Sequence, residues 1–91
     1  MNIRFYLDAD TGLPHILSHG VSEIEVEDIL RFASEDRPGT EGSRLAVGQT
    51  RAGRFLRVVY VPDPDKDGVF VITAFDLKGK ALSAFRRRRR R

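Results

Sequence analysis

Positively charged side chains in the second half of the chain could together hold a phosphate backbone. Arg44, Arg54 and Arg57 fall in two predicted strands, and Lys78 and Lys80 follow a third. Guanidinium groups bind phosphate oxygens and can stabilise charge on a phosphorane, while a lysine or a histidine can carry a proton. RNA cleavage further needs only a 2′-hydroxyl held in line with the phosphorus. The alternative is that these cations cover apolar rims and pair with nearby carboxylates.

Two histidines, His15 and His19, have the spacing that lets two imidazoles on one helix share a metal ion. Residues 16–18 between them lack the glutamate of an H-E-x-x-H motif, so we expect no metal there. His19 precedes Gly20 and is a candidate proton donor near neutral pH. The alternative is that His19 only packs or makes a hydrogen bond at a helix end.

The other motifs do not support a metal, a cofactor or an activated nucleophile. The chain has no cysteine, which excludes disulfides, thiolate nucleophiles and cysteine-based metal sites. Asp63–Gly68 matches the first six positions of an EF-hand calcium loop, but Ala74 stands where the bidentate glutamate is needed. The glycines do not have the spacing of a phosphate loop, and no serine lies in a nucleophile turn. We therefore predict no metal and no cofactor.

The net charge of +3 conceals an uneven distribution. The chain has 16 Lys and Arg against 13 Asp and Glu residues, and the run Arg86–Arg91 contains six of the arginines. The part before this run is therefore acidic overall. A block of like charges either stays solvated or serves as an arm for nucleic acid or an acidic partner. In the second case we expect Arg86, Arg87 and Arg88 to contact RNA.

A length of 91 residues fits one domain. We predict a single domain over residues 1–85 and a polyarginine tail over residues 86–91. The longest apolar run falls far short of the roughly 20 residues that span a bilayer. The N-terminus has no pattern of a secretory signal, so we expect a cytoplasmic protein without membrane contact.

Hydrophobic periodicity predicts an α+β fold with two N-terminal helices. The first short helix is expected over residues 11–19, capped by Thr11 and ended by Gly20. Ser22 and Glu25 have the spacing of a capping box at the start of the second helix, which buries one stripe. That stripe contains Val26, Ile29, Leu30 and Ala33. Residues 3–7 before the helices read as a short extended segment that could add a strand.

From Arg44 onward the pattern is that of strands: residues 44–50 alternate with a period of two, whereas residues 54–61 and 69–75 are apolar on both faces, as in central strands. Strands over residues 44–50, 54–61 and 69–75 predict a three-stranded antiparallel meander, whereas residues 34–43 are expected to form a loop. Gly53 is expected at the positive-φ position of the first hairpin. The chain then ends in a helix capped by Asp76, with inward-facing Leu77, Ala81 and Phe85. If the helices cover one face of the sheet, the cations named above could line the other.

In the order and spacing of four segments, the chain resembles the BrnT-like toxins, small RelE-fold proteins of bacterial type II toxin–antitoxin pairs. The segments are His15–Ser22 (HILSHGVS, similar to the family's KHGVS junction), Leu45–Thr50, Gly53–Tyr60 and Val71–Ala74. The resemblance implies a RelE-like fold and a ribonuclease that cuts translated, ribosome-bound mRNA. It further implies a cognate antitoxin that binds DNA and is made from the adjacent gene.

Our hypothesis is therefore a toxin-like endoribonuclease that cleaves mRNA by metal-independent attack of the 2′-hydroxyl. Arg57 would stabilise the phosphorane and Lys80 or His19 would carry protons. The RNA would be held by Arg44, Arg54, Lys78 and the tail residues Arg86, Arg87 and Arg88. The alternative is a non-catalytic module that binds RNA or an acidic partner through the arginine tail.

Overall fold

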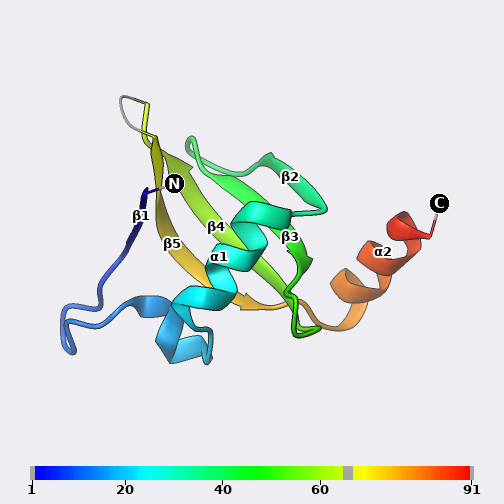
Figure 1. The fold of residues 1–91 in the computed structure, drawn as a ribbon, viewed down its shortest axis with the longest axis horizontal. Coiled ribbons are helices and arrows are strands. Elements are labelled where there is room, and N and C mark those ends of the chain that lie inside the picture. Colours follow the sequence, from blue (N-terminus) through cyan, green and yellow to red (C-terminus); the bar gives the residue numbers. More distant parts are fainter. Residues whose placement is uncertain (1, 65–66, 91) are drawn as a thin grey trace.

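The computed structural model describes residues 2–64 and 67–90 (Figure 1). Along the chain the elements are β1 (Asn2–Phe5), the 3-10 helix η1 (His15–His19), α1 (Glu23–Phe32), β2 (Glu35–Pro38), β3 (Arg44–Gln49), β4 (Phe55–Pro62), β5 (Gly68–Asp76) and α2 (Gly79–Arg89). The five strands form one sheet in the order β1-β5-β4-β3-β2. β1 runs parallel to β5, and the other neighbouring strands are antiparallel.

The predicted fold, with two N-terminal helices and a three-stranded meander in a RelE-like arrangement, is wrong. β3, β4 and β5 do form the expected antiparallel hairpins, but a strand is added at each edge. β2 lies in the segment predicted to be a loop and pairs with β3. Its Pro38 lacks an N–H donor, which an edge strand tolerates. β1 pairs with β5, and this partner is too distant in the sequence for a local pattern to reveal.

The first predicted helix is reduced to the single 3-10 turn of η1. Pro14 precedes this turn with an extended backbone, and the residue before a proline disfavours the helical region. Thr11 therefore caps no helix, and its hydroxyl accepts a hydrogen bond from Leu13 N at 3.2 Å. The predicted end is confirmed, because Gly20 has a left-handed φ of 70°.

The prediction for α1 is confirmed in its cap and in its buried stripe. Ser22 Oγ accepts from Glu25 N at 3.2 Å, and a Glu25 carboxylate oxygen accepts from Ser22 N at 2.9 Å. Val26 and Ile29 are fully buried. They belong to the main core, where the inner residues of β3, β4 and β5 meet α1 and η1. α1 therefore covers one face of the sheet.

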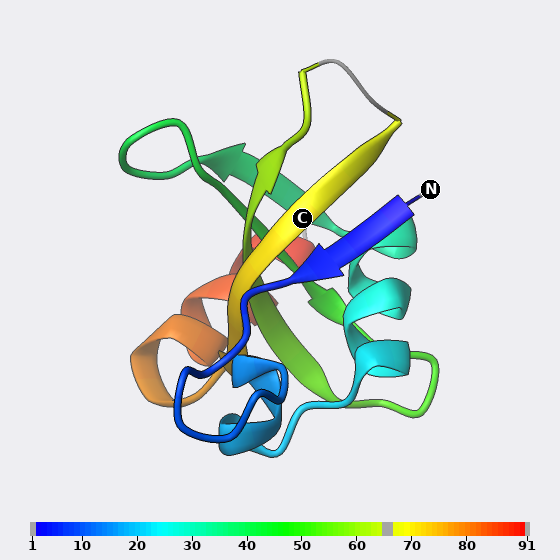
Figure 2. The ribbon, with the colours of Figure 1, turned by 90° about the vertical axis from the view of Figure 1, so that its left-hand side faces the viewer.

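α2 lies on the opposite side of the sheet from α1 (Figure 2). Phe85, Leu77 and Val47 form a second, smaller buried cluster, against which Phe55 and Leu82 pack. The predicted inward position of Ala81 is wrong, because Ala81 is exposed and Leu82 packs in its place. Lys78 takes the N-cap position predicted for Asp76, since Asp76 still belongs to β5.

Candidate functional site

The strand register separates the arginines that the sequence grouped together. Arg57 lies opposite Val47 and Phe75, whereas Arg44 lies opposite the buried Tyr60. Tyr60 and Arg57 are three residues apart in one strand, so their side chains leave opposite faces of the sheet. Arg44 therefore lies on the α1 side and Arg57 on the other, which we call the open face. The open face carries Arg4, Arg37, Leu45, Arg57, Val59, Phe70, Thr73 and Phe75, with α2 covering one end.

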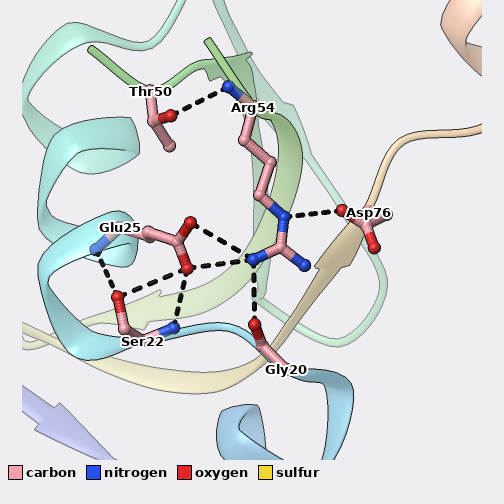
Figure 3. A network of polar contacts seen from close by, with 6 residues as sticks. All are labelled: Gly20, Ser22, Glu25, Thr50, Arg54 and Asp76. Carbon is pink, nitrogen blue, oxygen red and sulfur yellow. Dashed lines mark hydrogen bonds and ion pairs between the residues drawn. The ribbon is translucent and has the colours of Figure 1, made fainter. Parts of the chain in front are cut away.

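Arg54 is held in a polar network on the α1 side (Figure 3). Its Nε donates to Asp76 at 2.7 Å, and its Nη1 donates to Gly20 O at 2.8 Å and to a Glu25 oxygen at 3.0 Å. The hydrogen bond from Arg54 lowers the pKa of Asp76. The pKa of Glu25 is also lowered, first by the backbone N–H of Ser22 and then by Arg54. Arg54 therefore joins the β3–β4 hairpin, the α1 cap and the end of β5.

Arg44 has a similar structural role at the other end of the sheet. Its Nε donates to Asp36 at 2.8 Å, and the hydroxyl of Tyr60 donates to the same carboxylate. Burial, followed by the negative charge of Asp36, raises the pKa of Tyr60 to about 12. These bonds attach β2 to the body of the sheet. Arg44 and Arg54 are therefore both occupied by partners within the protein and do not reach the open face.

Arg57 has no such partner. Within the described part of the chain, its side chain makes neither an ion pair nor a hydrogen bond, and its Nε is buried. Its guanidinium carbon lies 5.9 Å from the centre of the Phe75 ring, on the neighbouring strand. The hydroxyl of Thr73, also on the open face, is likewise buried without a partner among the described residues. Unsatisfied buried polar groups are uncommon, and a bound ligand, ion or water is one explanation for them.

A pocket of about 180 Å³ adjoins Arg57 between the sheet and α2. Arg37, Arg57 and Arg88 line it together with a single acidic residue, Glu35. Glu35 accepts from Arg88 Nε at 2.6 Å and from Arg37 at 2.6 Å. The bond from Arg88 lowers the pKa of Glu35. One carboxylate thus faces three guanidinium groups, and the excess positive charge favours an anion in the pocket.

A second arginine–phenylalanine pair lies on the same face. The guanidinium carbon of Arg4, on β1, is 5.2 Å from the centre of the Phe70 ring on β5. Arg4 also pairs with Asp63 at 2.7 Å. Arg4, Arg37 and the two phenylalanines are missing from the predicted site. Alternation along β1 predicts that Arg4 points to the face opposite that of the core residues of this strand. Only the pairing of β1 with β5 brings Arg4 to Phe70.

The predicted proton carriers lie at the end of β5, with different surroundings. The His19 ring is 6.2 Å from the Phe75 ring, so Phe75 contacts both His19 and Arg57. A shallow surface pocket is lined by His19, Phe75, Asp76 and Lys78. Lys80 is exposed in the first turn of α2 and lines neither this pocket nor the one at Arg57. His19 and Lys78 thus share a surface pocket with Phe75, the residue that contacts Arg57, whereas Lys80 does not.

The arginine tail continues α2 as a helix through Arg89. The guanidinium carbon of Arg86 lies 5.0 Å from the centre of the Phe55 ring. Arg88 pairs with Glu35, whereas Arg87 is exposed. The tail residues therefore border the same end of the open face as the pocket at Arg57.

The calcium-like loop falls partly outside the described residues, at positions 65 and 66. Across residues 2–64 and 67–90, no three His, Asp or Glu side chains are grouped so that they could share a metal ion. In the same ranges, no helix is both long and apolar enough to cross a bilayer.

A family model described as a domain of unknown function (DUF4258) matches residues 15–76. The chain belongs to this family. The matched region runs from η1 to the end of β5 and contains the Arg54 network, Arg57 and Phe75. It excludes β1 with Arg4 and α2 with the arginine tail. Searches of curated proteins and of solved structures each found no match.

Proposed function

We propose that this protein is a toxin-like endoribonuclease that binds single-stranded RNA across the open face of its sheet. The observation that carries the proposal is Arg57, an arginine with a buried Nε and no partner among the described residues. Keeping a buried Nε–H without an acceptor is costly unless a ligand supplies one. A phosphate diester has the charge and the acceptor oxygens to do so.

The aromatic side chains beside the arginines favour unpaired RNA as the substrate. Phe70 and Phe75 lie on one strand, and each has an arginine at its ring. Bases of single-stranded RNA stack on such rings while arginines contact the adjacent phosphates. A duplex offers its bases only at the groove edges, so this surface suits an unfolded messenger RNA.

Cleavage would proceed by in-line attack of a 2′-hydroxyl on the phosphorus bound at Arg57. The guanidinium stabilises the negative charge that develops on the phosphorane. His19, which contacts the same phenylalanine as Arg57, is placed to move a proton. By its resemblance to the BrnT-like toxins, the protein would act in the cytoplasm and be neutralised by a DNA-binding antitoxin from the adjacent gene.

Replacing Arg57 by methionine tests this function. We expect R57M to cleave single-stranded RNA at least about 100-fold more slowly than the wild type, because the phosphorane loses its charge partner. The matched control is R31M, since Arg31 pairs with Glu27 on the exposed side of α1 and loses the same charge. Undiminished cleavage by R57M would rule out the assignment of Arg57. Absence of cleavage by the wild type would rule out the endoribonuclease.

A cellular experiment addresses the toxin role separately. Induced expression in a bacterium should arrest growth, and co-expression of the neighbouring small reading frame should restore it. Harmless overexpression would contradict the toxin role. The second candidate function is a non-catalytic module that binds RNA or an acidic partner, which the exposed arginines at the end of α2 favour.

A further inference from the structure

A second pocket beside α2 has no role in the function proposed above. Its volume is about 470 Å³, which is enough for a ligand of the size of a nucleotide. The sheet contributes Gln49, the last residue of β3, and Phe55, the first residue of β4. The lining residues from α2 and its C-terminal end are Phe85, Arg86, Arg89 and Arg90. These four do not line the pocket at Arg57, so the two pockets adjoin different faces of the helix.

The arginines of this second pocket have the spacing of one helix face. Positions 86, 89 and 90 are related as i, i+3 and i+4, and side chains at this spacing are neighbours. Arg90 follows the last residue of α2, but its N donates to Arg86 O at 3.2 Å and so continues the turn. Among the described residues, no carboxylate lines the pocket, and Arg86, Arg89 and Arg90 form no ion pair. The positive charge is therefore less offset here than at Arg57, where Glu35 lines the pocket.

A flat aromatic surface accompanies this charge. The Phe55 ring is partly buried and packs edge-on against Phe85, with 6.0 Å between ring centres. The guanidinium carbon of Arg86 lies 5.0 Å from the centre of the Phe55 ring. Nucleobases stack on aromatic rings and on guanidinium planes. Gln49 is directly paired with Phe55 in the register of β3 and β4, and its Nε2 donates to Gly53 O at 3.1 Å. The Oε1 atom of Gln49 is then an acceptor for the amino group of a base.

We infer that the second pocket binds a nucleotide, with the base against Phe55 and Arg86 and the phosphate at Arg89 and Arg90. An acidic peptide would use the arginines only, whereas a nucleotide uses the aromatic surface as well. The nucleotide is either free or part of a single strand, because the faces of a base within a duplex are covered by the neighbouring bases. Arg57 is not part of this pocket, so the inference does not depend on whether the protein cleaves RNA.

The decisive comparison is between Arg89→Gln and Arg87→Gln, both made in the Arg57→Met protein so that binding at the open face is reduced. Each variant loses one charge from the same turn of α2, but Arg87 does not line the second pocket. We expect Arg89→Gln to bind single-stranded hexaadenylate at least about fivefold more weakly, because a charge-assisted hydrogen bond to phosphate is lost. For Arg87→Gln we expect a loss of less than about twofold at physiological salt. Fluorescence anisotropy measures both affinities, and equal losses would overturn the inference.

Phe55→Leu tests the stacking of the base. Leucine keeps an apolar contact with Phe85 but offers no flat face. The affinity for hexaadenylate should therefore fall at least about fivefold, with the same dependence on salt concentration as before. An unchanged affinity would overturn the inference. Arg89 is exposed, so Arg89→Gln still decides the matter if Phe55→Leu does not fold.

Two probes distinguish a free nucleotide from a nucleic acid strand. In nitrogen-15 spectra of the wild type, the amide signals of Gln49 and Phe55 should shift when the probe binds. Shifts with adenosine monophosphate would assign the pocket to free nucleotides, and shifts with hexaadenylate alone would assign it to a single strand. Shifts with neither probe would overturn the inference. A wild-type protein that shows these shifts but cleaves no RNA would refute only the endoribonuclease function.

Discussion

Arg54 and Arg57 are three residues apart, and their guanidinium groups have opposite surroundings. Arg54 donates to two carboxylates and one carbonyl oxygen, and its side chain is 30% exposed. Arg57 makes no polar contact through its side chain with any described residue, although its Nε is buried. An arginine such as Arg54, whose donors are satisfied within the protein, contributes to stability. An arginine such as Arg57 still has donors available for a ligand.

The first prediction at this scale concerns Arg54. Replacing it by methionine leaves Glu25 and Asp76 without their cation, which should lower the free energy of unfolding by about 2 kcal/mol after allowance for solvent screening. Urea denaturation measures this loss. The matched variant R57M loses the same charge without losing a polar partner, and it removes a buried Nε that has none, so its free energy of unfolding should not fall. If R54M and R57M lost the same free energy of unfolding, the inference that Arg54 stabilises the fold and Arg57 does not would be contradicted.

The pH dependence of stability gives a second readout for the same variant. The pKa of Asp76 lies below its ordinary 3.8 because Arg54 donates to it. A carboxyl with a lowered pKa in the folded state stabilises the fold above its ordinary pKa, and this contribution is lost as the pH falls through the folded-state value. The stability of the wild type should therefore decline on acidification below about pH 5. In R54M this decline should be shallower.

At the scale of elements, the edge strand β1 depends on a glycine in its partner. A Cβ atom added at Gly68 would lie 2.4 Å from the backbone oxygen of Asn2, a distance that forces the strands apart. Gly68 and Asn2 are directly paired in the register of β1 and β5. Because Arg4 lies on β1, the same pairing positions Arg4 over Phe70 on the open face.

We therefore expect Gly68→Ala to loosen β1 and to cost about 1–3 kcal/mol of stability. Hydrogen exchange of the β1 amides should become faster, and RNA affinity should fall as Arg4 leaves Phe70. Gly48→Ala is the matched control, because the nearest atoms to its added Cβ are at 3.4 Å, close to ordinary contact. If the β1 amides of Gly68→Ala exchanged hydrogen as slowly as those of the wild type, β1 would not depend on Gly68.

At the scale of the whole molecule, an acidic body carries a basic terminal helix. The arginines of α2 border the open face, and Arg88 is tied to it by the pair with Glu35. The Glu35 side chain is only 14% exposed, but the Arg88 side chain is 43% exposed, so solvent screens the pair and it should add only about 0–1 kcal/mol to stability. Under the proposed function, we therefore expect the tail to act mainly by attracting polyanions towards the open face.

Truncation after Phe85 tests whether the tail attracts RNA without taking part in cleavage. The shortened protein should neutralise fewer phosphates of a single-stranded RNA. For each phosphate lost, the slope of log affinity against log salt concentration should become shallower by about 0.7. Cleavage at saturating RNA should persist, because Arg57 and His19 remain. Fluorescence anisotropy over a salt series measures the slope, with Glu35→Gln as a control that keeps all the arginines. Complete loss of cleavage would instead make the tail part of the catalytic site.

Local features of this protein could be predicted from the amino-acid sequence alone. The capping box of Ser22 and Glu25, the end of η1 at Gly20 and the positive φ of Gly53 are all confirmed. Each depends on residues within a few positions, so backbone sterics and near-neighbour hydrogen bonds decide it. Strand alternation alone could also have separated Arg54 from Arg57, because residues three apart leave opposite faces of a strand.

The candidate site depended on contacts that only the tertiary structure makes. The parallel pairing of β1 with β5 and the addition of β2 extend the sheet, and they bring Arg4 and Arg37 to its open face. Arg54 finds Glu25 and Asp76 at separations of 29 and 22 residues, which makes it structural. The residues next to Arg44, Arg54 and Arg57 do not show which of them will meet a carboxylate, because the carboxylates come from distant segments. Their roles differ because folding brings carboxylates to Arg44 and Arg54, whereas Glu35, the carboxylate in the pocket at Arg57, pairs with Arg37 and Arg88 instead.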